Sequence, residues 1–166
     1  MTDRTTTVER ASDKEIVASR TVNGPPHLVY EAWTKAELFK KWWVPKSFPL
    51  VLLSCDMDVR VGGKYKLVFD FNGQNAEFFG TYLEVVPSAR LVWTNEEGGE
   101  TAAAITTVTF EARDGRTFLR MSDLHPTKEA LEASGAMDAT PETFDQLEEL
   151  IVSGLHPSSG AATAGA

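Results

Sequence analysis

Cysteine is nearly absent from this sequence. Cys55 is the single cysteine among 166 residues. One thiol cannot close an internal disulfide, and a lone thiol is typical of a reducing compartment. The longest apolar runs, such as Leu50 to Leu53, fall far short of the roughly 20 residues that a membrane-spanning helix needs, and the polar start of the chain lacks the apolar segment of a signal peptide. We therefore expect a cytoplasmic protein with no membrane partner.

The sequence also contains few positively charged residues. Lys and Arg number 16 against 24 Asp and Glu, a net charge of −8. Phosphate backbones and anionic membrane surfaces attract cationic proteins, so this balance argues against nucleic acid as a partner. The three histidines (His27, His125 and His156) are scattered, and no phosphate-binding loop or nucleophile elbow is present. We expect neither a metal nor a cofactor.

The length corresponds to about one domain, large enough to bury a core without a disulfide or metal. Residues 1–14 are polar without periodicity, and residues 155–166 are rich in small side chains. Neither end offers much apolar surface to bury, so we predict a disordered N-terminal arm and a disordered C-terminal tail. A single folded domain over 15–154 remains.

The first part of this domain alternates between a strand pattern and helix signals. Weak alternation over 15–22 predicts a strand. A proline at 26 suits the first turn of a helix, predicted over 26–33. Thr34-Lys-Ala-Glu37 has the form of a capping box, which predicts a second helix starting at 34 and ending before Pro45.

The middle of the chain changes to short strand-length runs separated by Gly, Asn, Asp and Pro. Such spacing predicts an antiparallel meander. The predicted strands are 49–60, 63–72, 76–86, 90–96, 104–112 and 116–123. Alternation is clearest at Tyr65, Leu67, Phe69 and Phe71, which give one strand an apolar face.

The last predicted element is a helical region over 127–153 with a break near Gly135 to Pro141. Its apolar stripe is formed by Phe144, Leu147, Leu150 and Ile151. The stripe needs a surface to cover, and the apolar sheet face provides it. The predicted fold is therefore α+β in the order β-α-α-β6-α, a curved antiparallel sheet of about seven strands around a long C-terminal helix.

Several segments together resemble one protein superfamily. They are Ala36–Pro45, Asp58–Gly63, Phe79–Pro87, Arg90–Thr94, Val108–Glu111 and Phe144–Leu147. Over about 15–153 the chain resembles the START-like helix-grip (SRPBCC) superfamily, whose fold is that of the birch pollen allergen. Within it the sequence is most similar to proteins resembling the C-terminal domain of the activator of the ninety-kilodalton heat-shock chaperone ATPase.

The resemblance implies a fold more firmly than an activity, because relatives include lipid carriers, hormone receptors, polyketide cyclases and co-chaperone domains. It also suggests a heat-shock chaperone partner and a role in stress response. Two departures stand out. Fourteen polar residues cannot supply the separate chaperone-binding domain of the eukaryotic activator, and Val44 stands where relatives commonly have glycine.

We predict that the space between the sheet and the C-terminal helix is a ligand cavity of roughly 300–1,000 Å³. Its predicted wall residues are Trp43, Tyr65, Leu67, Phe69, Phe79 and Trp93, with Leu147 as a lid. The Tyr65 hydroxyl is expected to orient the ligand. Asp123 and His125 are the candidates for acid–base chemistry, but polar residues at a strand end beside a proline are commonly solvated, so we assign no catalytic residue.

Three functional hypotheses follow. The first is a non-enzymatic domain that binds an apolar or aromatic small molecule. The second is a chaperone-activator-like module that binds another protein, and the third is a cyclase- or hydrolase-like enzyme. An exposed apolar patch on the outer sheet face would favour the second, and a buried carboxylate or histidine facing the cavity would favour the third. We expect a monomer or a homodimer.

Overall fold

Eight strands form one antiparallel sheet in the order β1-β2-β8-β7-β6-β5-β4-β3. The computed structural model describes residues 6–96, 103–134 and 139–154. The strands are β1 (Thr7–Arg10), β2 (Glu15–Val22), β3 (Leu50–Met57), β4 (Lys64–Phe71), β5 (Gln74–Val86), β6 (Arg90–Asn95), β7 (Ala104–Arg113) and β8 (Arg116–Leu124). The helices are α1 (Pro26–Thr34), α2 (Ala36–Trp42), α3 (Lys128–Ser134) and α4 (Thr140–Val152).

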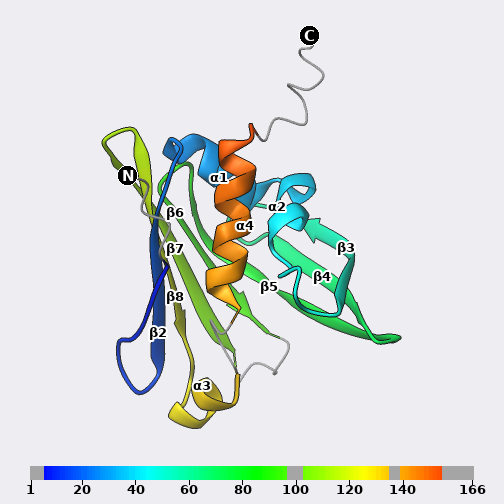
Figure 1. Ribbon diagram of the computed structural model, residues 1–166. Coiled ribbons are helices and arrows are strands. Elements are labelled where there is room, and N and C mark those ends of the chain that lie inside the picture. Colours follow the sequence, from blue (N-terminus) through cyan, green and yellow to red (C-terminus); the bar gives the residue numbers. More distant parts are fainter. Residues whose placement is uncertain (1–5, 97–102, 135–138, 155–166) are drawn as a thin grey trace.

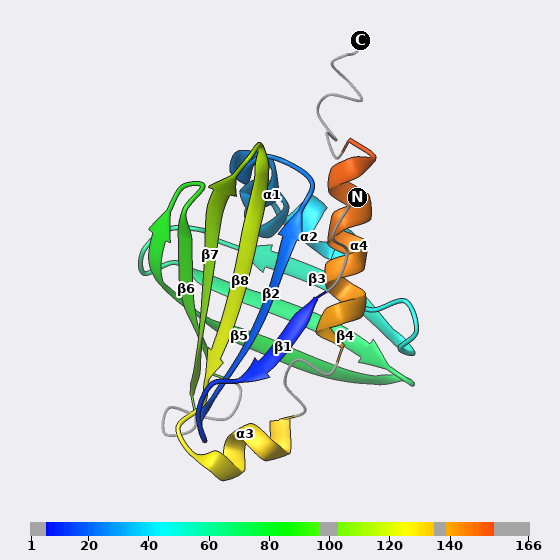
Figure 2. The same ribbon diagram turned by 60° about the vertical axis from the view of Figure 1, so that its left-hand side comes forward.

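The sheet curves around α4, which lies inside the curve in both ribbon views (Figures 1 and 2). In Figure 2, β3, β4 and β5 run steeply across the direction of β2, β8 and β7. The α+β class and the antiparallel sheet around a C-terminal helix are confirmed, and each of the seven predicted strands is present within a few residues of its predicted limits.

The eighth strand, β1, corrects the prediction of a disordered arm over residues 1–14. It pairs with β2 from Thr7 opposite Ser19 to Arg10 opposite Ile16. All four of its residues are exposed, so the segment carries no apolar alternation that a sequence pattern would reveal.

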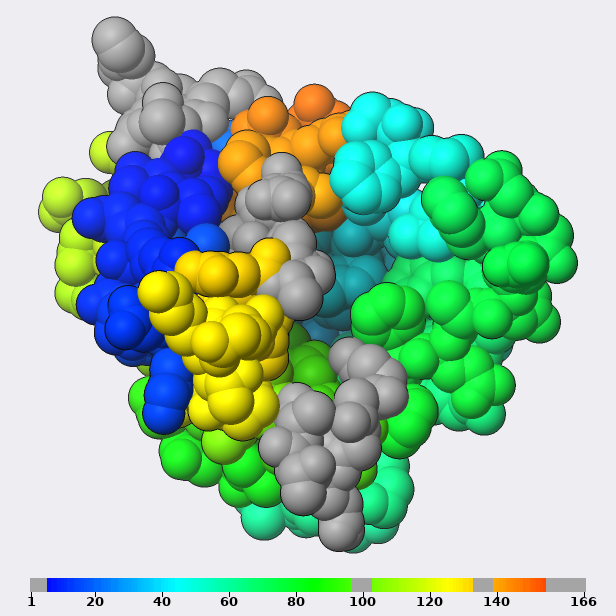
Figure 3. All heavy atoms as spheres, turned by 90° about the horizontal axis from the view of Figure 1, so that it is seen from below, coloured from blue at the N-terminus to red at the C-terminus, as the bar shows by residue number. Residues whose placement is uncertain are grey.

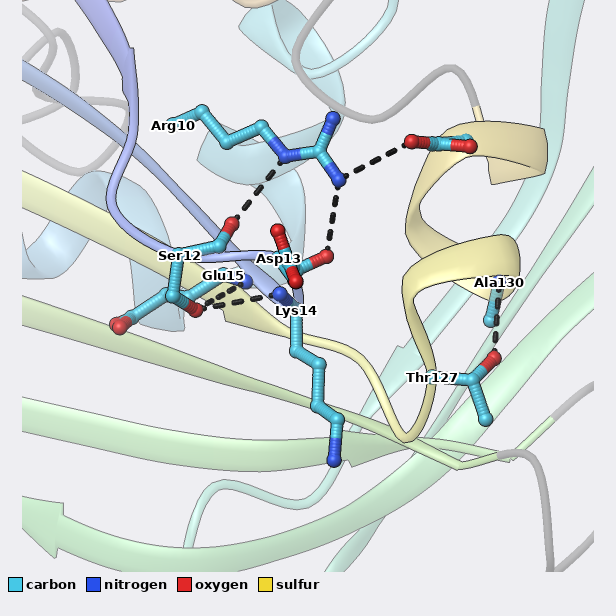
Figure 4. A network of polar contacts seen from close by, with 8 residues as sticks. Arg10, Ser12, Asp13, Lys14, Glu15, Thr127 and Ala130 are labelled. Atoms are coloured by element: carbon cyan, nitrogen blue, oxygen red, sulfur yellow. Dashed lines mark hydrogen bonds and ion pairs between the residues drawn. The ribbon is translucent and has the colours of Figure 1, made fainter.

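Arg10 fixes the turn that follows β1. Its Nε donates a hydrogen bond to the Ser12 carbonyl (3.2 Å) and its Nη2 donates to the Asp13 carbonyl (3.0 Å), as Figure 4 shows. The same Nη2 lies 3.3 Å from a carboxylate oxygen of Glu132 on α3. One side chain therefore ties β1 to the helix at the bottom of the sheet.

The N-terminal ends of α3 and α2 differ in whether a threonine caps the helix. Thr127 accepts a hydrogen bond from the Ala130 N–H (3.0 Å, Figure 4) and so caps α3. Thr34 does not cap α2, because its hydroxyl donates back to the Tyr30 carbonyl (2.9 Å) within α1. Helix α2 starts only at Ala36. The predicted break in the final helical region falls largely on residues 135–138, outside the described residues.

Helix α4 lays its apolar stripe on the concave face of the sheet. Phe144 and Leu147 are fully buried, Ile151 is almost so, and Leu150 is half-buried. The close packing is visible at Gly24, where a Cβ atom would lie 2.4 Å from Cγ2 of Ile151. Removing water from this stripe is the main force that holds α4 in place.

Polar contacts fix the position of α4 along the sheet. Arg20 points inward from β2 with its side chain fully buried, and it forms ion pairs with Asp145 and Glu148 of α4. The Glu148 carboxylate is also fully buried and accepts a hydrogen bond from the Asn23 N–H (3.2 Å). A charge removed from water needs such partners to be tolerated.

Gln146 joins α4 to the segment after α2. Its Nε2 donates to the carbonyls of Trp42 (2.9 Å) and Val44 (2.8 Å), while its Oε1 accepts from the Lys46 N–H (2.9 Å). One amide thus satisfies three backbone groups that follow a helix end. The segment after α2 is thereby held against α4.

Candidate ligand-binding site

Strand β5 divides the sheet into two halves. Its first part pairs with β4 up to Thr81, and its second part pairs with β6 from Tyr82 onward. Gly80 lies at the change of partner, where a Cβ atom would be 1.8 Å from the Thr94 carbonyl oxygen. Only glycine permits this close approach of backbone to backbone.

A cavity of about 50 Å³ lies where α1 and α2 meet this part of the sheet. Its wall is formed by Trp33, Phe39, Trp43, Met57, Tyr65, Leu67, Phe78, Tyr82, Trp93 and Asn95. The space-filling view from below shows the molecule hollowed between α4 and strands β4 and β5, with the α1–α2 region at the floor (Figure 3). The enclosed space suits roughly three to five water molecules.

The cavity is smaller than predicted because large aromatic rings from the helices occupy the space. Trp33 lies edge-on to Trp42 and Trp43, at ring-centroid distances of 4.7 and 5.8 Å. Phe39 stacks on Trp43 at 4.6 Å. Trp42, whose indole N–H donates to the Ala32 carbonyl, is fully buried in the core.

Four of the seven predicted site residues come together in the cavity wall: Trp43, Tyr65, Leu67 and Trp93. The structure places the other three elsewhere. Phe69 is buried beside the cavity and packs edge-on against Phe78 (5.3 Å). Leu147 is fully buried in the core under α4 and does not act as a lid.

Phe79 lies on the opposite, outer face of the sheet. Register decides this, because Leu67 opposes Phe78 and Lys66 opposes Phe79. On the outer face Phe79 borders a shallow depression of about 550 Å³ together with Glu77 and Lys66, whose charged groups lie 3.5 Å apart. Charged side chains line this depression, whereas none lines the cavity on the other side.

Six wall residues were not predicted from the sequence: Trp33, Phe39, Met57, Phe78, Tyr82 and Asn95. For β5 a signal was present. Phe78, Gly80 and Tyr82 share one face, while Glu77 and Thr81 flank Phe79 on the other. The two polar neighbours of Phe79 mark its face as the solvated one. No comparable pattern identifies Trp33, since its place in the wall depends on how α1 packs.

A hydrogen-bonded network borders the cavity on its polar side. The single proton of the Tyr65 hydroxyl is shared between two acceptors, the Thr94 carbonyl (2.9 Å) and Asn95 Oδ1 (3.1 Å). Asn95 Nδ2 donates to the Thr106 hydroxyl (2.9 Å), which donates to Asp123 Oδ1 (2.7 Å). The Tyr65 hydroxyl is thus hydrogen-bonded to residues of β6, whereas we expected it to orient a ligand.

Comparison with known proteins now adds to this geometry. The family model described as Activator of Hsp90 ATPase homolog 1-like protein matches residues 23–151. The chain belongs to this family. The resemblance to the START-like, SRPBCC superfamily is thereby confirmed. A search among curated proteins gives no significant match.

Solved structures of family-like proteins share the fold. A protein of Nitrosomonas europaea is 27% identical with a TM-score of 0.76, and the match covers 86% of this chain and 96% of that one. A protein of Chromobacterium violaceum is 28% identical with a TM-score of 0.74, covering 84% and 98%. An AHSA1-like protein of Aeromonas hydrophila is 17% identical with a TM-score of 0.65, covering 85% and 96%, which shows the fold alone.

In this Activator of Hsp90 ATPase homolog 1-like chain, burial favours the neutral form of Tyr82 in the cavity wall and of Cys55 outside it. Burial raises the pKa of the Tyr82 hydroxyl well above its usual range. Burial, with the nearby Asp56 charge, raises the pKa of Cys55 to about 11, so the thiol is not a thiolate nucleophile at neutral pH. Its Sγ lies 3.5 Å from Sδ of Met57.

Asp123 is a half-buried carboxyl group that the network joins to this site. Burial raises its pKa, opposed by the hydrogen bond from Thr106 and by the charge of His125. Asp123 is thus half-buried, not fully solvated as expected. Neither Asp123 nor His125 is part of the cavity wall.

Within the ranges 6–96, 103–134 and 139–154, no three His, Cys, Asp or Glu side chains gather as a metal site would require. In the same part of the chain, no helix is both long and apolar enough to cross a membrane.

Proposed function

We propose that this protein binds a small apolar or aromatic molecule in the cavity between α1, α2 and the sheet. The observation that carries the proposal is the wall itself. Aromatic and aliphatic side chains from two helices and four strands enclose a space that they leave unfilled. Concave, mostly apolar sites with a few polar groups are the usual form of ligand pockets.

The volume limits the occupant. About 50 Å³ is enclosed, less than the roughly 150 Å³ in which an engineered cavity holds benzene. A single ring therefore enters with adjustment of the mouth, where Phe78 is 43% exposed. This supports a one-ring ligand in place of a long lipid chain.

The test is calorimetric titration with p-xylene. We expect binding with a negative heat-capacity change, as burial of apolar surface requires. Leu67→Trp fills the cavity and should weaken binding at least tenfold, with melting curves confirming that the variant is folded. Phe79→Ala, on the outer face, is the matched control and should bind as the unaltered protein does. The absence of binding to the unaltered protein, or equal binding by Leu67→Trp, would refute the proposal.

A second proposed function is a chaperone-activator-like interaction with another protein. It rests on the family description and on exposed apolar side chains of the edge strand β3, with Val51 56% and Leu53 54% exposed. If this function holds, the protein should alter the ATPase rate of the ninety-kilodalton chaperone, and Leu53→Asp should abolish the effect. A cytoplasmic location, a role in stress response and a monomeric or homodimeric state belong to this proposal. The enzyme hypothesis has no comparable support.

A further inference from the structure

The cavity wall contains one buried hydrogen-bond donor without a partner, the indole nitrogen of Trp33. Its Nε1 forms no hydrogen bond within the described part of the chain, and the side chain lines the cavity with 1% of its surface exposed. Among the wall residues, all of which the structure describes, no other side-chain nitrogen or oxygen is both buried and unpaired. An indole N–H can only donate, and leaving a buried donor unpaired costs free energy.

The surroundings of Trp33 leave the cavity as the source of an acceptor. Six aromatic rings lie at centroid distances of 4.7 to 6.3 Å from the Trp33 ring, those of Phe39, Trp42, Trp43, Trp93, Phe110 and Phe144. None of these side chains carries an acceptor oxygen, and the Trp42 N–H is itself a donor, bound to the Ala32 carbonyl. An acceptor for Trp33 therefore has to enter through the space that the rings leave unfilled.

Two other polar residues of the wall, Tyr65 and Asn95, are already paired with the sheet. The proton of Tyr65 is shared between the Thr94 carbonyl and Asn95 Oδ1. Asn95 Nδ2 donates to Thr106 (2.9 Å) and to the Ala104 carbonyl (3.3 Å). An oxygen that already takes part in one hydrogen bond tolerates an empty lone pair better than an N–H tolerates having no acceptor. The unmet need of the wall is therefore that of a donor.

The wall carries no charged side chain. A carboxylate ligand would lose its hydration without meeting a cation, and the net charge of −8 adds repulsion at a distance. A neutral carbonyl oxygen accepts a hydrogen bond and needs no cation, so it suits a single indole donor in an apolar wall.

We infer that the ligand is a neutral, one-ring aromatic compound bearing a carbonyl group, whose oxygen accepts a hydrogen bond from Nε1 of Trp33. This rests on the proposed function and deepens it by naming the ligand class. The apolar wall holds the ring, and Trp33 distinguishes a carbonyl compound from a hydrocarbon of the same shape.

The first test compares acetophenone with α-methylstyrene, two molecules of the same shape that differ by C=O in place of C=CH2. In calorimetric titration we expect the unaltered protein to bind acetophenone about three- to tenfold more tightly, the effect of one net hydrogen bond. Trp33→Phe removes the donor and should lose this preference, while any space that the smaller ring opens serves both probes alike. The charged probe benzoate should bind weakest.

Trp42→Phe is the matched control. It also removes a buried indole, but one outside the cavity wall whose N–H already donates to the Ala32 carbonyl. This variant should keep the preference for acetophenone. Melting curves of both variants show whether they are folded.

A second measurement uses the unaltered protein and so does not depend on how a variant folds. In nitrogen–proton correlation spectra, acetophenone should move the indole N–H proton signal of Trp33 downfield, because a hydrogen bond to oxygen deshields the proton. The same concentration of bound α-methylstyrene should not produce this downfield movement. Nuclear Overhauser effects to the ring of Phe110 identify the signal, since that ring lies 6.3 Å from the Trp33 ring between centroids.

The outcomes separate the two proposals. If acetophenone binds no better than α-methylstyrene, if Trp33→Phe keeps the preference, or if the Trp33 signal responds equally to both probes, the inference about the carbonyl is wrong and the proposed cavity function stands. Loss of the preference in Trp42→Phe as well would assign it to ring packing and would also overturn the inference. Tighter binding of benzoate than of acetophenone would overturn the neutral ligand class. Failure of both neutral probes and of p-xylene to bind would refute the proposed function itself.

Discussion

The two halves of the sheet differ in how completely their inward faces are covered. The half built from β2, β8 and β7 is covered by two helices. Helix α4 packs on β2 through its buried stripe and the Arg20 ion pairs, and α1 packs on β7 through rings that contact Phe110. In the half built from β3, β4 and the first part of β5, aromatic side chains on the inward face stay partly open. Phe71 is 47% exposed and Phe78 is 43% exposed.

This difference separates the part of the fold that provides stability from the part that borders the cavity. The closed half, with β2, β8 and β7, is stabilised both by apolar packing and by buried polar contacts. The cavity lies at its boundary with the open half, where α1 and α2 supply rings to the wall. Substitutions should therefore cost much more in one half than in the other.

The largest contrast is expected between two phenylalanines. Phe144→Ala, in the closed half, should lower the free energy of unfolding by about 3–5 kcal/mol, because a fully buried ring is replaced by a void. Phe78→Ala, in the open half, should cost about 1 kcal/mol, since nearly half of its side chain is already in water. Urea denaturation of both variants measures the difference. Equal losses would show that the two halves are equally closed.

A slightly smaller effect is expected at the buried charges. Arg20→Met leaves Glu148 buried without its cation and should cost about 3 kcal/mol. The double variant Arg20→Met, Glu148→Met removes both charges and should recover most of that loss. A double variant as unstable as the single one would mean that the ion pair itself, and not the avoidance of a lone charge, fastens α4.

Asp123, a half-buried carboxyl group of the closed half, predicts a pH dependence. Burial raises the folded-state pKa of Asp123 above its ordinary value of about 3.9. Its stabilising contribution is therefore complete below that value and is lost as pH rises through the folded-state pKa. Asp123→Asn, which stays neutral, should gain in stability relative to the unaltered protein as pH rises from about 4 to 7. Urea denaturation across this range checks the trend, and a difference that does not change with pH would contradict it.

The smallest effect is expected at β1. The pair between Arg10 and Glu132 is about half exposed on both sides, and such surface pairs contribute at most about 1 kcal/mol. Arg10→Ala should therefore shift the melting temperature by only a few degrees. A large drop would place β1 among the elements that close the sheet, and thermal unfolding at low salt is the measurement.

The sequence predicted the elements whose patterns are local. Seven strands and the stripe of α4 followed from alternation, turn residues and helical spacing. Strand β1 could not be found this way, because four exposed residues bury nothing that would make a pattern. The capping box predicted at Thr34 is absent because the Thr34 hydroxyl donates to the Tyr30 carbonyl in α1.

The candidate site was only half predictable. Tyr65, Leu67 and Trp93 lie in the wall because strand alternation fixes their face. Phe79 was assigned to the wrong face by one residue, the error to which two adjacent aromatics are prone. The cavity volume depends on how the rings from α1 and α2 fill the space, which no single-chain pattern gives.

The contacts of α4 also constrain how the chain is made. Gln146 bonds to Val44 across about a hundred residues, and β2 finds its partner β8 only after the whole meander. Since synthesis proceeds from the N-terminus, every strand leaves the ribosome before the helix that covers their apolar face. The part of the concave surface that α4 covers is therefore bare until the last helix is made, and aggregation competes with folding most strongly in that interval.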